Sequence, residues 1–177
     1  AALKYYEIAL NLNINLFGEK SIEVQELYRN IGNVYYNQDM YTQAIDVYLK
    51  ALEIVLRTKG PKHMLVGCLF TDLGNCFAYM EGKEAPAMIN LHDGIKILLK
   101  HPMRDKGILL DNFYSQGHVL KNIKDFKGSL MAFKKVLTLC QQYDKSKVEN
   151  FKTRIARLEK RAMKLESISP FEDIWKF

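Results

Sequence analysis

Polar side chains that can form hydrogen bonds recur in three short stretches of the sequence, around Gly32, Gly74 and Gly117. Many of them are three or four residues apart, a spacing that places them on one face if each stretch is helical. Asparagine carries both donors and an acceptor, so it can bind a peptide backbone of any sequence, and tyrosine adds contact area at low entropy cost. This chemistry indicates recognition of a protein or an extended peptide, although a solvated polar face is the alternative interpretation. The candidate binding residues are Arg29, Asn30, Asn33, Tyr36, Asn37, Thr71, Asp72, Asn75, Tyr79, Asp111, Tyr114, Ser115, His118 and Asn122.

Residues with catalytic potential do not form a recognisable site. The sequence lacks the glycine-rich phosphate-binding motifs and the HExxH zinc motif. Asp72 and Asp111 are candidates to meet on one face, but no acid, base or pocket supports them, so they indicate recognition. The histidines are scattered over different segments: His63, His92, His101 and His118. We therefore expect no enzyme, no cofactor and no metal site.

The cysteines and the hydropathy pattern bear on location. Cys68 and Cys76 would lie about 12 Å apart on one helix, too far for a disulfide bond. Together with Cys140 they are expected to be reduced and buried, which favours a cytoplasmic location, with association with the cytoskeleton as one option. No apolar stretch of about 18 residues is present, so no membrane span is expected.

An internal repeat explains the spacing of the three glycines, which are 42 and 43 residues apart. Glycine inside a helix costs roughly 1 kcal/mol relative to alanine, so its recurrence indicates that helix backbones approach closely there. Residues 28–35 carry an aromatic, an aliphatic, a glycine and a second aromatic residue, and residues 70–77 and 113–120 repeat most of this pattern. Residues 2–10 align with residues 44–52 in the same way. The small residues expected at the packing contacts are Gly32, Ala44, Ala51, Gly74, Ala87, Gly94, Gly117 and Ser129.

The periodicity predicts helices throughout the chain and divides it into units. Helices are expected near residues 1–16, 21–37, 41–57, 63–80, 85–100, 105–122, 126–142 and 145–166. Residues 1–20 form the second helix of a repeat, three helix pairs occupy about 21–60, 61–102 and 103–142, and a basic capping helix covers 145–166. We expect further repeats upstream of residue 1; the alternative is that the helix near 1–16 itself caps the N-terminal end.

The repeated pattern resembles the tetratricopeptide repeat over roughly residues 1–142, and its long period is similar to the kinesin light chain subclass. The resemblance implies an all-α fold, a right-handed α-solenoid of antiparallel helix pairs with a concave groove lined by the first helix of each pair. Gln116 departs from the pattern, because the other two copies have an aliphatic residue there.

The resemblance also bears on the ligand. Members of this family that hold the C-terminal carboxylate of a chaperone use a clamp of basic and asparagine side chains. Arg29 and Asn33 match the first half of that clamp, but Asp72 stands where asparagine is expected. Asp111 and Ser115 stand where lysine and arginine are expected. Because two acids would repel a carboxylate, a neutral or basic peptide, or a folded partner, is favoured.

The positive charge is concentrated in one segment. The chain has a net charge of +6, and residues 145–166 alone contribute +5. This helix is able to contact nucleic acid, anionic lipid or an acidic protein, but its basic residues are spread around the helix, so a solvated outer face is the alternative. The following tail, residues 167–177, contains Trp175 close to Phe171, Ile174 and Phe177. We expect it to pack either on its own solenoid or on a partner.

The function indicated is that of a non-enzymatic scaffold that binds a peptide or protein partner in the concave groove. The alternative is a structural subunit of a larger multiprotein assembly, cytoskeletal or ciliary, or a cargo adaptor similar to kinesin light chain. Nucleic-acid binding through the basic helix is the third and least favoured hypothesis.

Overall fold

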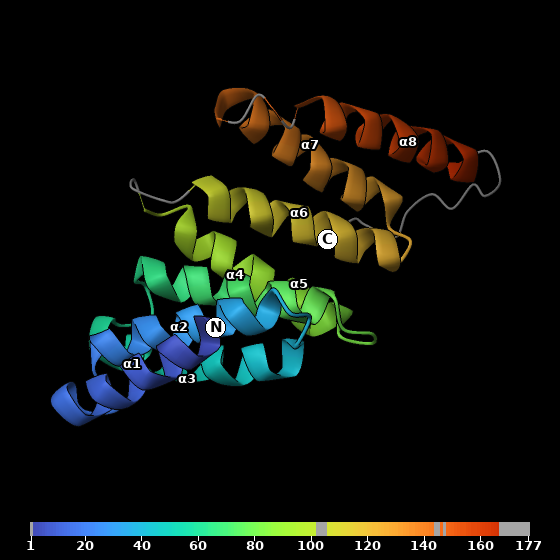
Figure 1. Ribbon diagram of the computed structural model, residues 1–177. Coiled ribbons are helices and arrows are strands. Elements are labelled where there is room, and N and C mark those ends of the chain that lie inside the picture. The colour runs from blue at the N-terminus through green and yellow to red at the C-terminus, as the bar shows by residue number, and fades with distance from the viewer. Residues whose placement is uncertain (1, 102–105, 144–145, 147, 167–177) are drawn as a thin grey trace.

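The computed structural model describes residues 2–101, 106–143, 146 and 148–166. Within these residues the regular elements are α-helices, which stack in chain order from one end of the molecule to the other (Figure 1). The helices are α1 (Ala2–Phe17), α2 (Ile22–Tyr36), α3 (Tyr41–Lys59), α4 (Met64–Ala78), α5 (Glu84–Leu98), α6 (Lys106–Asn122), α7 (Phe126–Tyr143) and α8 (Val148–Glu166). The predicted tail, residues 167–177, lies outside the described residues.

Short turns fold consecutive helices back on one another as pairs. Helix α2 packs on α3, α4 on α5 and α6 on α7. Neighbouring pairs are joined by contacts of α3 with α4 and of α5 with α6, while α4 also contacts α6. Helix α1 covers α2 at one end, and α8 covers α7 at the other. The chain is thus an all-α solenoid of antiparallel helix pairs.

The turn within each pair contains one residue in the left-handed region. Asp39, Gly82 and Lys124 have φ values of 58°, 72° and 66°, and they lie in the turns before α3, α5 and α7 respectively. Only glycine adopts this conformation without a steric penalty. Two of the three turns therefore place a residue with a side chain where glycine would be less strained.

A large side chain lies over each repeat glycine. An added Cβ at Gly74 would lie 2.7 Å from Cγ of Leu91, and one at Gly117 would lie 2.8 Å from Cζ of Phe133. At Gly32 the obstructing group is the ring of Tyr48. The sequence analysis expects the small residue of the second helix to fill this role, but Ala44 is not among the nearest atoms, which belong to the aromatic or leucine side chain one turn further along.

The small residues take part in other close contacts. Ser129 Oγ donates a hydrogen bond of 2.8 Å to the carbonyl oxygen of Gly117. Between α4 and α5, an added Cβ at Gly94 would lie 2.9 Å from the carbonyl oxygen of Gly67 and 2.8 Å from Oγ1 of Thr71. The two backbones therefore approach closely at a pair of glycines, of which the repeat pattern identifies only Gly94.

Helix α8 buries one apolar stripe against the last pair. Phe151, Ile155 and Leu158 are buried, and they form a cluster with residues of α7 that include Phe133 and Val136. Lys134 of α7 forms an ion pair of 3.0 Å with Glu159 of α8. The charged side chains of α8 that are described lie mostly outside this contact, as an amphipathic covering helix requires.

Candidate partner-binding face

The first helices of the three pairs, α2, α4 and α6, lie next to one another. Arg29 of α2 forms an ion pair with Asp72 of α4, and Asn112 of α6 donates a hydrogen bond of 2.9 Å to Oγ1 of Thr71 in α4. These contacts bring all three predicted groups of polar residues into one region. We call the exposed and half-buried residues of this region the first-helix face: Asn30, Asn33, Tyr36, Asn37, Asn75, Tyr79, Asp111, Tyr114, His118 and Asn122.

The ion pair joins the first two groups of predicted residues. Nε of Arg29 lies 2.7 Å from Oδ2 of Asp72, and the two side chains are 25% and 14% exposed. Burial lowers the pKa of the Arg29 guanidinium, but the charge of Asp72, its hydrogen bond with Arg29 and smaller contributions from Cys68 and Tyr48 together outweigh this effect and raise the pKa. Burial raises the pKa of Asp72, and Arg29 opposes that shift. Each charge thus has its partner within the protein, and Arg29 is already engaged.

A row of aromatic rings crosses the three helices. Tyr41 stacks on Tyr79 with ring centres 5.6 Å apart, and both meet Tyr36 edge to face. His118 lies 6.4 Å from Tyr79 and 5.0 Å from Tyr114, measured between ring centres. Edge-to-face and offset contacts of this kind stabilise aromatic clusters. The row therefore forms a preordered surface, and Tyr79 at its centre is 48% exposed.

Two phenols in this row, those of Tyr36 and Tyr41, remain neutral. Burial raises the pKa of the Tyr36 phenol, and Tyr79 adds to the shift. The hydroxyl of Tyr41 donates a hydrogen bond of 2.6 Å to Oδ1 of Asp39, which raises the pKa of Tyr41 to about 12. At neutral pH these side chains are thus hydrogen-bonding aromatic groups that carry no charge.

The asparagines differ in what they already bind. Oδ1 of Asn33 accepts a hydrogen bond of 2.7 Å from the hydroxyl of Tyr48, so this asparagine supports the packing of the helix pair. Oδ1 of Asn75 is buried and has no hydrogen-bond partner. Asn30 is half-buried, whereas Asn37 and Asn122 are exposed at the ends of α2 and α6. An unpartnered buried acceptor is rare in proteins, and this oxygen distinguishes Asn75 from Asn33, although it is closed to solvent in the structure.

Thr71 and Ser115, which the sequence analysis places among the binding residues, are buried instead. Thr71 is 1% exposed, and its hydroxyl donates a hydrogen bond of 3.0 Å to the carbonyl oxygen of Gly67. Thr71 faces α5 because Gly94 allows that helix to come close. Ser115 is likewise buried in α6. Neither side chain is open to a partner, so the prediction for these two residues is wrong.

Two polar residues of α6 that are absent from the predicted binding residues, Asn112 and Gln116, form hydrogen bonds in the interior. Asn112 is fully buried, and its Nδ2 also donates a hydrogen bond of 2.9 Å to the carbonyl oxygen of Leu91. Its Oδ1 accepts a hydrogen bond of 2.9 Å from Nε2 of Gln116. Asn112 stands where the earlier repeats have Leu27 and Leu69, so this second departure beside Gln116 is the signal that would have revealed the pair.

Two further observations on the described residues concern membranes and metals. None of their helices combines the length and the apolar character needed to cross a bilayer. In the same part of the chain, no three His, Cys, Asp or Glu side chains are grouped as metal ligands would be. The three cysteines are buried and not joined in disulfide bonds, and burial raises the pKa of the Cys76 thiol to about 12.

Comparisons with known proteins agree with the architecture. The family model of the tetratricopeptide repeat matches residues 23–99, which extend from α2 to the end of α5. Among solved structures, the crystal structure of BtubC (BKLC) from P. vanneervenii is similar, with a TM-score of 0.69, 22% sequence identity and coverage of 80% of this chain. The chain spans 56% of the length of that protein chain. A search of curated proteins gave no match. Residues 23–99 therefore match the tetratricopeptide repeat, within a chain that folds as an all-α solenoid of helix pairs.

Proposed function

We propose that this protein is a non-enzymatic scaffold that binds a peptide or protein partner along the first-helix face. Tetratricopeptide repeats generally mediate protein–protein interaction. The observation that carries the proposal for this chain is the row of aromatic rings from Tyr41 to Tyr114, which crosses three helices and leaves Tyr79 half exposed. Preordered tyrosine rings are suited to binding because little conformational entropy is lost when a partner covers them.

Asn75 supports recognition of the partner's backbone. Its Oδ1 is buried without a hydrogen-bond partner and lies one helical turn before Tyr79. Because this oxygen is closed to solvent, a peptide N–H would reach it only after neighbouring side chains shift, and would then satisfy it whatever the sequence of the peptide. The binding energy would then come from the aromatic row, and the register from the asparagine.

The charges favour a neutral or basic partner over a C-terminal carboxylate. Arg29, the basic residue that matches half of the carboxylate clamp, is already paired with Asp72 at 2.7 Å. Because that pair neutralises Asp72, the repulsion expected from this acid is weaker than the sequence alone indicates. Asp111 of α6 is a second acidic residue on this exposed face. A carboxylate would therefore have to compete with Asp72 for Arg29, which a neutral or basic peptide does not need to do.

We further propose that the repeats are of the long-period kind found in kinesin light chain, with a cytoplasmic location. The repeat glycines are spaced by 42 and 43 residues, and Gly18 and Gly60, which are 42 apart, both have φ near the left-handed region at 85° and 83°. Second helices of up to 19 residues, such as α3, account for the added length. One role that such repeats would serve is that of an adaptor between a motor protein and its cargo.

The test is binding to an array of extended peptides of three compositions: neutral, rich in Lys and Arg, and ending in acidic residues. Wild-type protein is expected to retain neutral or basic peptides. Replacing Asn30→Ala and Asn75→Ala together, or Tyr79→Ala alone, should remove that retention while leaving the melting temperature nearly unchanged. Equal retention by wild type and by these variants would rule out binding at this face.

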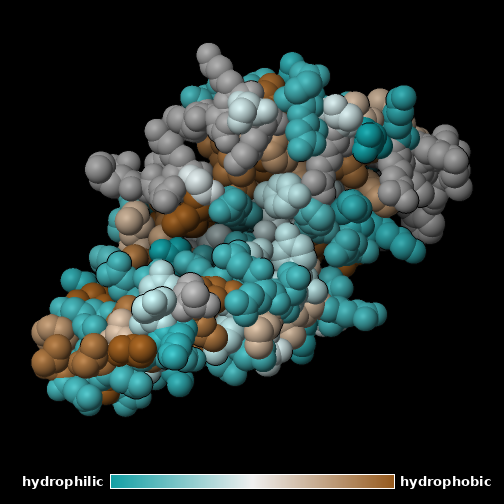
Figure 2. Space-filling model, in the orientation of Figure 1, coloured by the Kyte–Doolittle hydropathy of each residue, from teal (hydrophilic) through white to brown (hydrophobic). Residues whose placement is uncertain are grey.

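A structural role in an assembly is the second candidate, because α1 exposes an apolar stripe. Tyr5 and Leu16 are 73% and 72% exposed, and Ile8, Leu12 and Phe17 lie along the same helix with at least half of their surface exposed. Figure 2 shows this hydrophobic surface at the end of the molecule that α1 forms in Figure 1. The matched variant is Ile8→Ala with Leu12→Ala. Loss of assembly in this variant, with peptide retention intact, would favour the structural role.

A further inference from the structure

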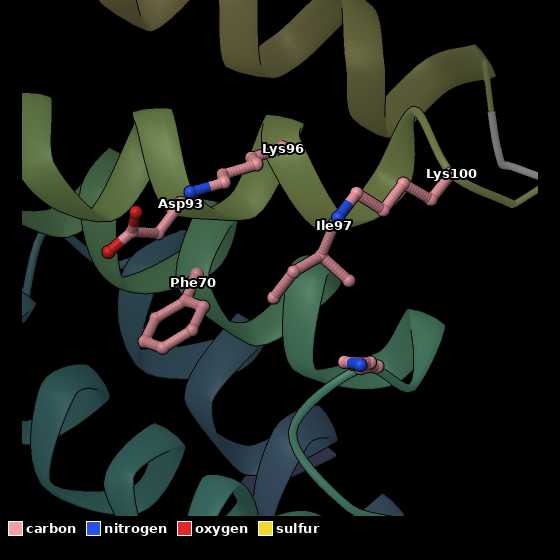
Figure 3. Close-up of a pocket in the computed structure, with 6 residues that line it drawn as sticks. Phe70, Asp93, Lys96, Ile97 and Lys100 are labelled. Carbon is pink, nitrogen blue, oxygen red and sulfur yellow. The ribbon is translucent and has the colours of Figure 1, made fainter.

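A pocket away from the first-helix face lies between α4, α5 and the link that precedes α4. It has a volume of about 220 Å³ and is lined by Lys62, Phe70, Asp93, Lys96, Ile97 and Lys100. Figure 3 shows Phe70 and Ile97 below the charged side chains of α5. The two apolar residues are half-buried, whereas the three lysines are exposed. The pocket therefore combines an apolar floor with a cationic rim.

The rim is held in place by a contact from the end of α5. His101 lies directly after this helix and its turn, and its Nε2 is 2.8 Å from the carbonyl oxygen of Lys62. This contact ties the link before α4 to the residues that follow α5. Lys62 on that link lines the same pocket as Lys96 of α5 and Lys100, which follows α5.

The preceding repeat shows which contacts cover the equivalent site. The six lining positions correspond, through the repeat offsets of 42 and 43, to Lys20, Tyr28, Lys50, Glu53, Ile54 and Arg57. In that repeat Lys20 forms an ion pair of 3.0 Å with Glu53, and Nζ of Lys50 lies 5.5 Å from the centre of the Tyr28 ring. In the first repeat, the site equivalent to the pocket is thus covered by contacts within the protein.

The second repeat has lost both of these contacts. Lys96 replaces the acid that Glu53 supplies, and Asp93 replaces Lys50, so the acid has moved one helical turn along α5. Within the described residues, Lys62, Lys96 and Lys100 make no ion pair. The same positions therefore present three ammonium groups and only one carboxylate, that of Asp93, around the floor formed by Phe70 and Ile97.

We propose that this pocket binds an acidic peptide segment that carries one large apolar side chain between carboxylates. The apolar side chain would lie between Phe70 and Ile97, since a cavity of about 150 Å³ already holds a benzene ring. The flanking carboxylates would take the place that Glu53 has in the first repeat and pair with Lys62, Lys96 and Lys100. An acidic peptide would thus supply the carboxylates that Glu53 supplies within the first repeat. This site is separate from the first-helix face and does not depend on its function.

The experiment uses the full chain and a fluorescent, capped peptide with the sequence Glu-Asp-Leu-Glu-Asp. Fluorescence anisotropy at low ionic strength should show that it binds about tenfold or more tightly than Gln-Asn-Leu-Gln-Asn, because the carboxylates face the lysines. The peptide Glu-Asp-Gly-Glu-Asp, which lacks the apolar side chain, should also bind more weakly. Equal affinity for the leucine and glycine peptides would overturn the proposal, because it would reveal a general anion site.

The decisive variant is Lys96→Glu, which recreates the arrangement of Lys20 and Glu53. It should fold with an unchanged melting temperature, because the first repeat accommodates the same pair, and it should weaken peptide binding by about tenfold or more. Lys4→Glu changes the net charge equally but lies on the exposed surface of α1, so it should leave binding nearly unchanged. Should Lys96→Glu not fold, Lys62→Gln with Lys100→Gln gives the same test. Wild-type affinity in a folded variant of the pocket would refute the site.

Discussion

The ring of Tyr48 lies directly over the backbone of Gly32, in the space that any side chain at residue 32 would need. Tyr48 is only 2% exposed, and its hydroxyl hydrogen bond of 2.7 Å to Asn33 fixes the ring in that place. Helix α3 therefore presses a large side chain against α2 where α2 has none. Leu91 over Gly74 and Phe133 over Gly117 repeat the relationship in the next two pairs.

This contact makes Gly32→Ala destabilising even though alanine is the better helix former. The new Cβ would overlap the Tyr48 ring, and the ring has little freedom to move because it is buried and hydrogen-bonded. We expect the free energy of unfolding to fall by about 1–3 kcal/mol, and Gly32→Leu to lower it further. Urea denaturation followed by circular dichroism measures the difference. In a Tyr48→Ala background the same Gly32→Ala change should cost much less, and equal losses in the two backgrounds would contradict the close-contact explanation.

The left-handed turn before α7 offers a stabilising substitution. Lys124 has φ of 66°, and the corresponding turn before α5 has Gly82 at 72°. Because a residue with a Cβ is strained there, Lys124→Gly should raise the free energy of unfolding by about 1 kcal/mol, or the melting temperature by about 2–4 °C. Asp39→Gly is the matched comparison, and its gain should be smaller because it removes the hydrogen bond from Tyr41. An unchanged or lower melting temperature for Lys124→Gly would show that the strain is relieved in another way.

The ion pair of Arg29 with Asp72 should stabilise the contact of α2 with α4 in a pH-dependent manner. Arg29→Ala leaves a mostly buried carboxylate without its partner. The loss should be about 2 kcal/mol at neutral pH, below the 3–5 kcal/mol of fully buried pairs, because both side chains keep some exposure. Chemical denaturation at several pH values measures it.

The sign of the pH dependence follows from the pKa of Asp72. Burial raises this pKa above its ordinary value of 3.8, and removing Arg29 takes away the charge that opposes the shift. A raised pKa in the folded state stabilises folding below the ordinary value and loses that contribution as the pH rises through the folded-state pKa. The defect of Arg29→Ala should therefore be large at neutral pH and shrink towards pH 3.8. Arg29→Ala with Asp72→Asn should show little pH dependence; a constant defect in both variants would exclude an ionised Asp72 as the cause.

Most of the architecture could be predicted because the repeat spacing reports on packing directly. A glycine inside an amphipathic helix is costly, so its return every 42 or 43 residues requires a close contact each time, and the helix pairs follow from it. The ends of helices were less predictable. The helix expected near 85–100 ends at Leu98, since terminal turns depend on local hydrogen bonds, and the expected start of the last helix at residue 145 lies outside the described residues.

Which of the candidate binding residues are exposed could be predicted less well, because spacing cannot fix how a helix is rotated against its neighbours. Thr71 lies three residues before Gly74 just as Arg29 lies three before Gly32, yet Thr71 is buried and Arg29 is partly exposed. The difference comes from Gly67 and Gly94, which let α5 come close enough to cover Thr71. Polarity alone selected candidate residues on three adjacent helices, and the partner helices decide which of these residues are exposed.

The buried pair of Asn112 and Gln116 in α6 allows the repeat pattern itself to be tested. Asn112→Leu restores the residue of the earlier repeats but leaves the Gln116 amide without the acceptor it now binds at 2.9 Å. We expect the single change to lower the free energy of unfolding by about 1–3 kcal/mol, the cost of an unpaired buried polar group. The double change Asn112→Leu with Gln116→Ile replaces both partners by the residue types of the first repeat and should recover most of this loss. A double change whose loss equals or exceeds that of the single change would mean that Asn112 is needed for its hydrogen bonds to Thr71 and Leu91, which join α6 to the preceding pair.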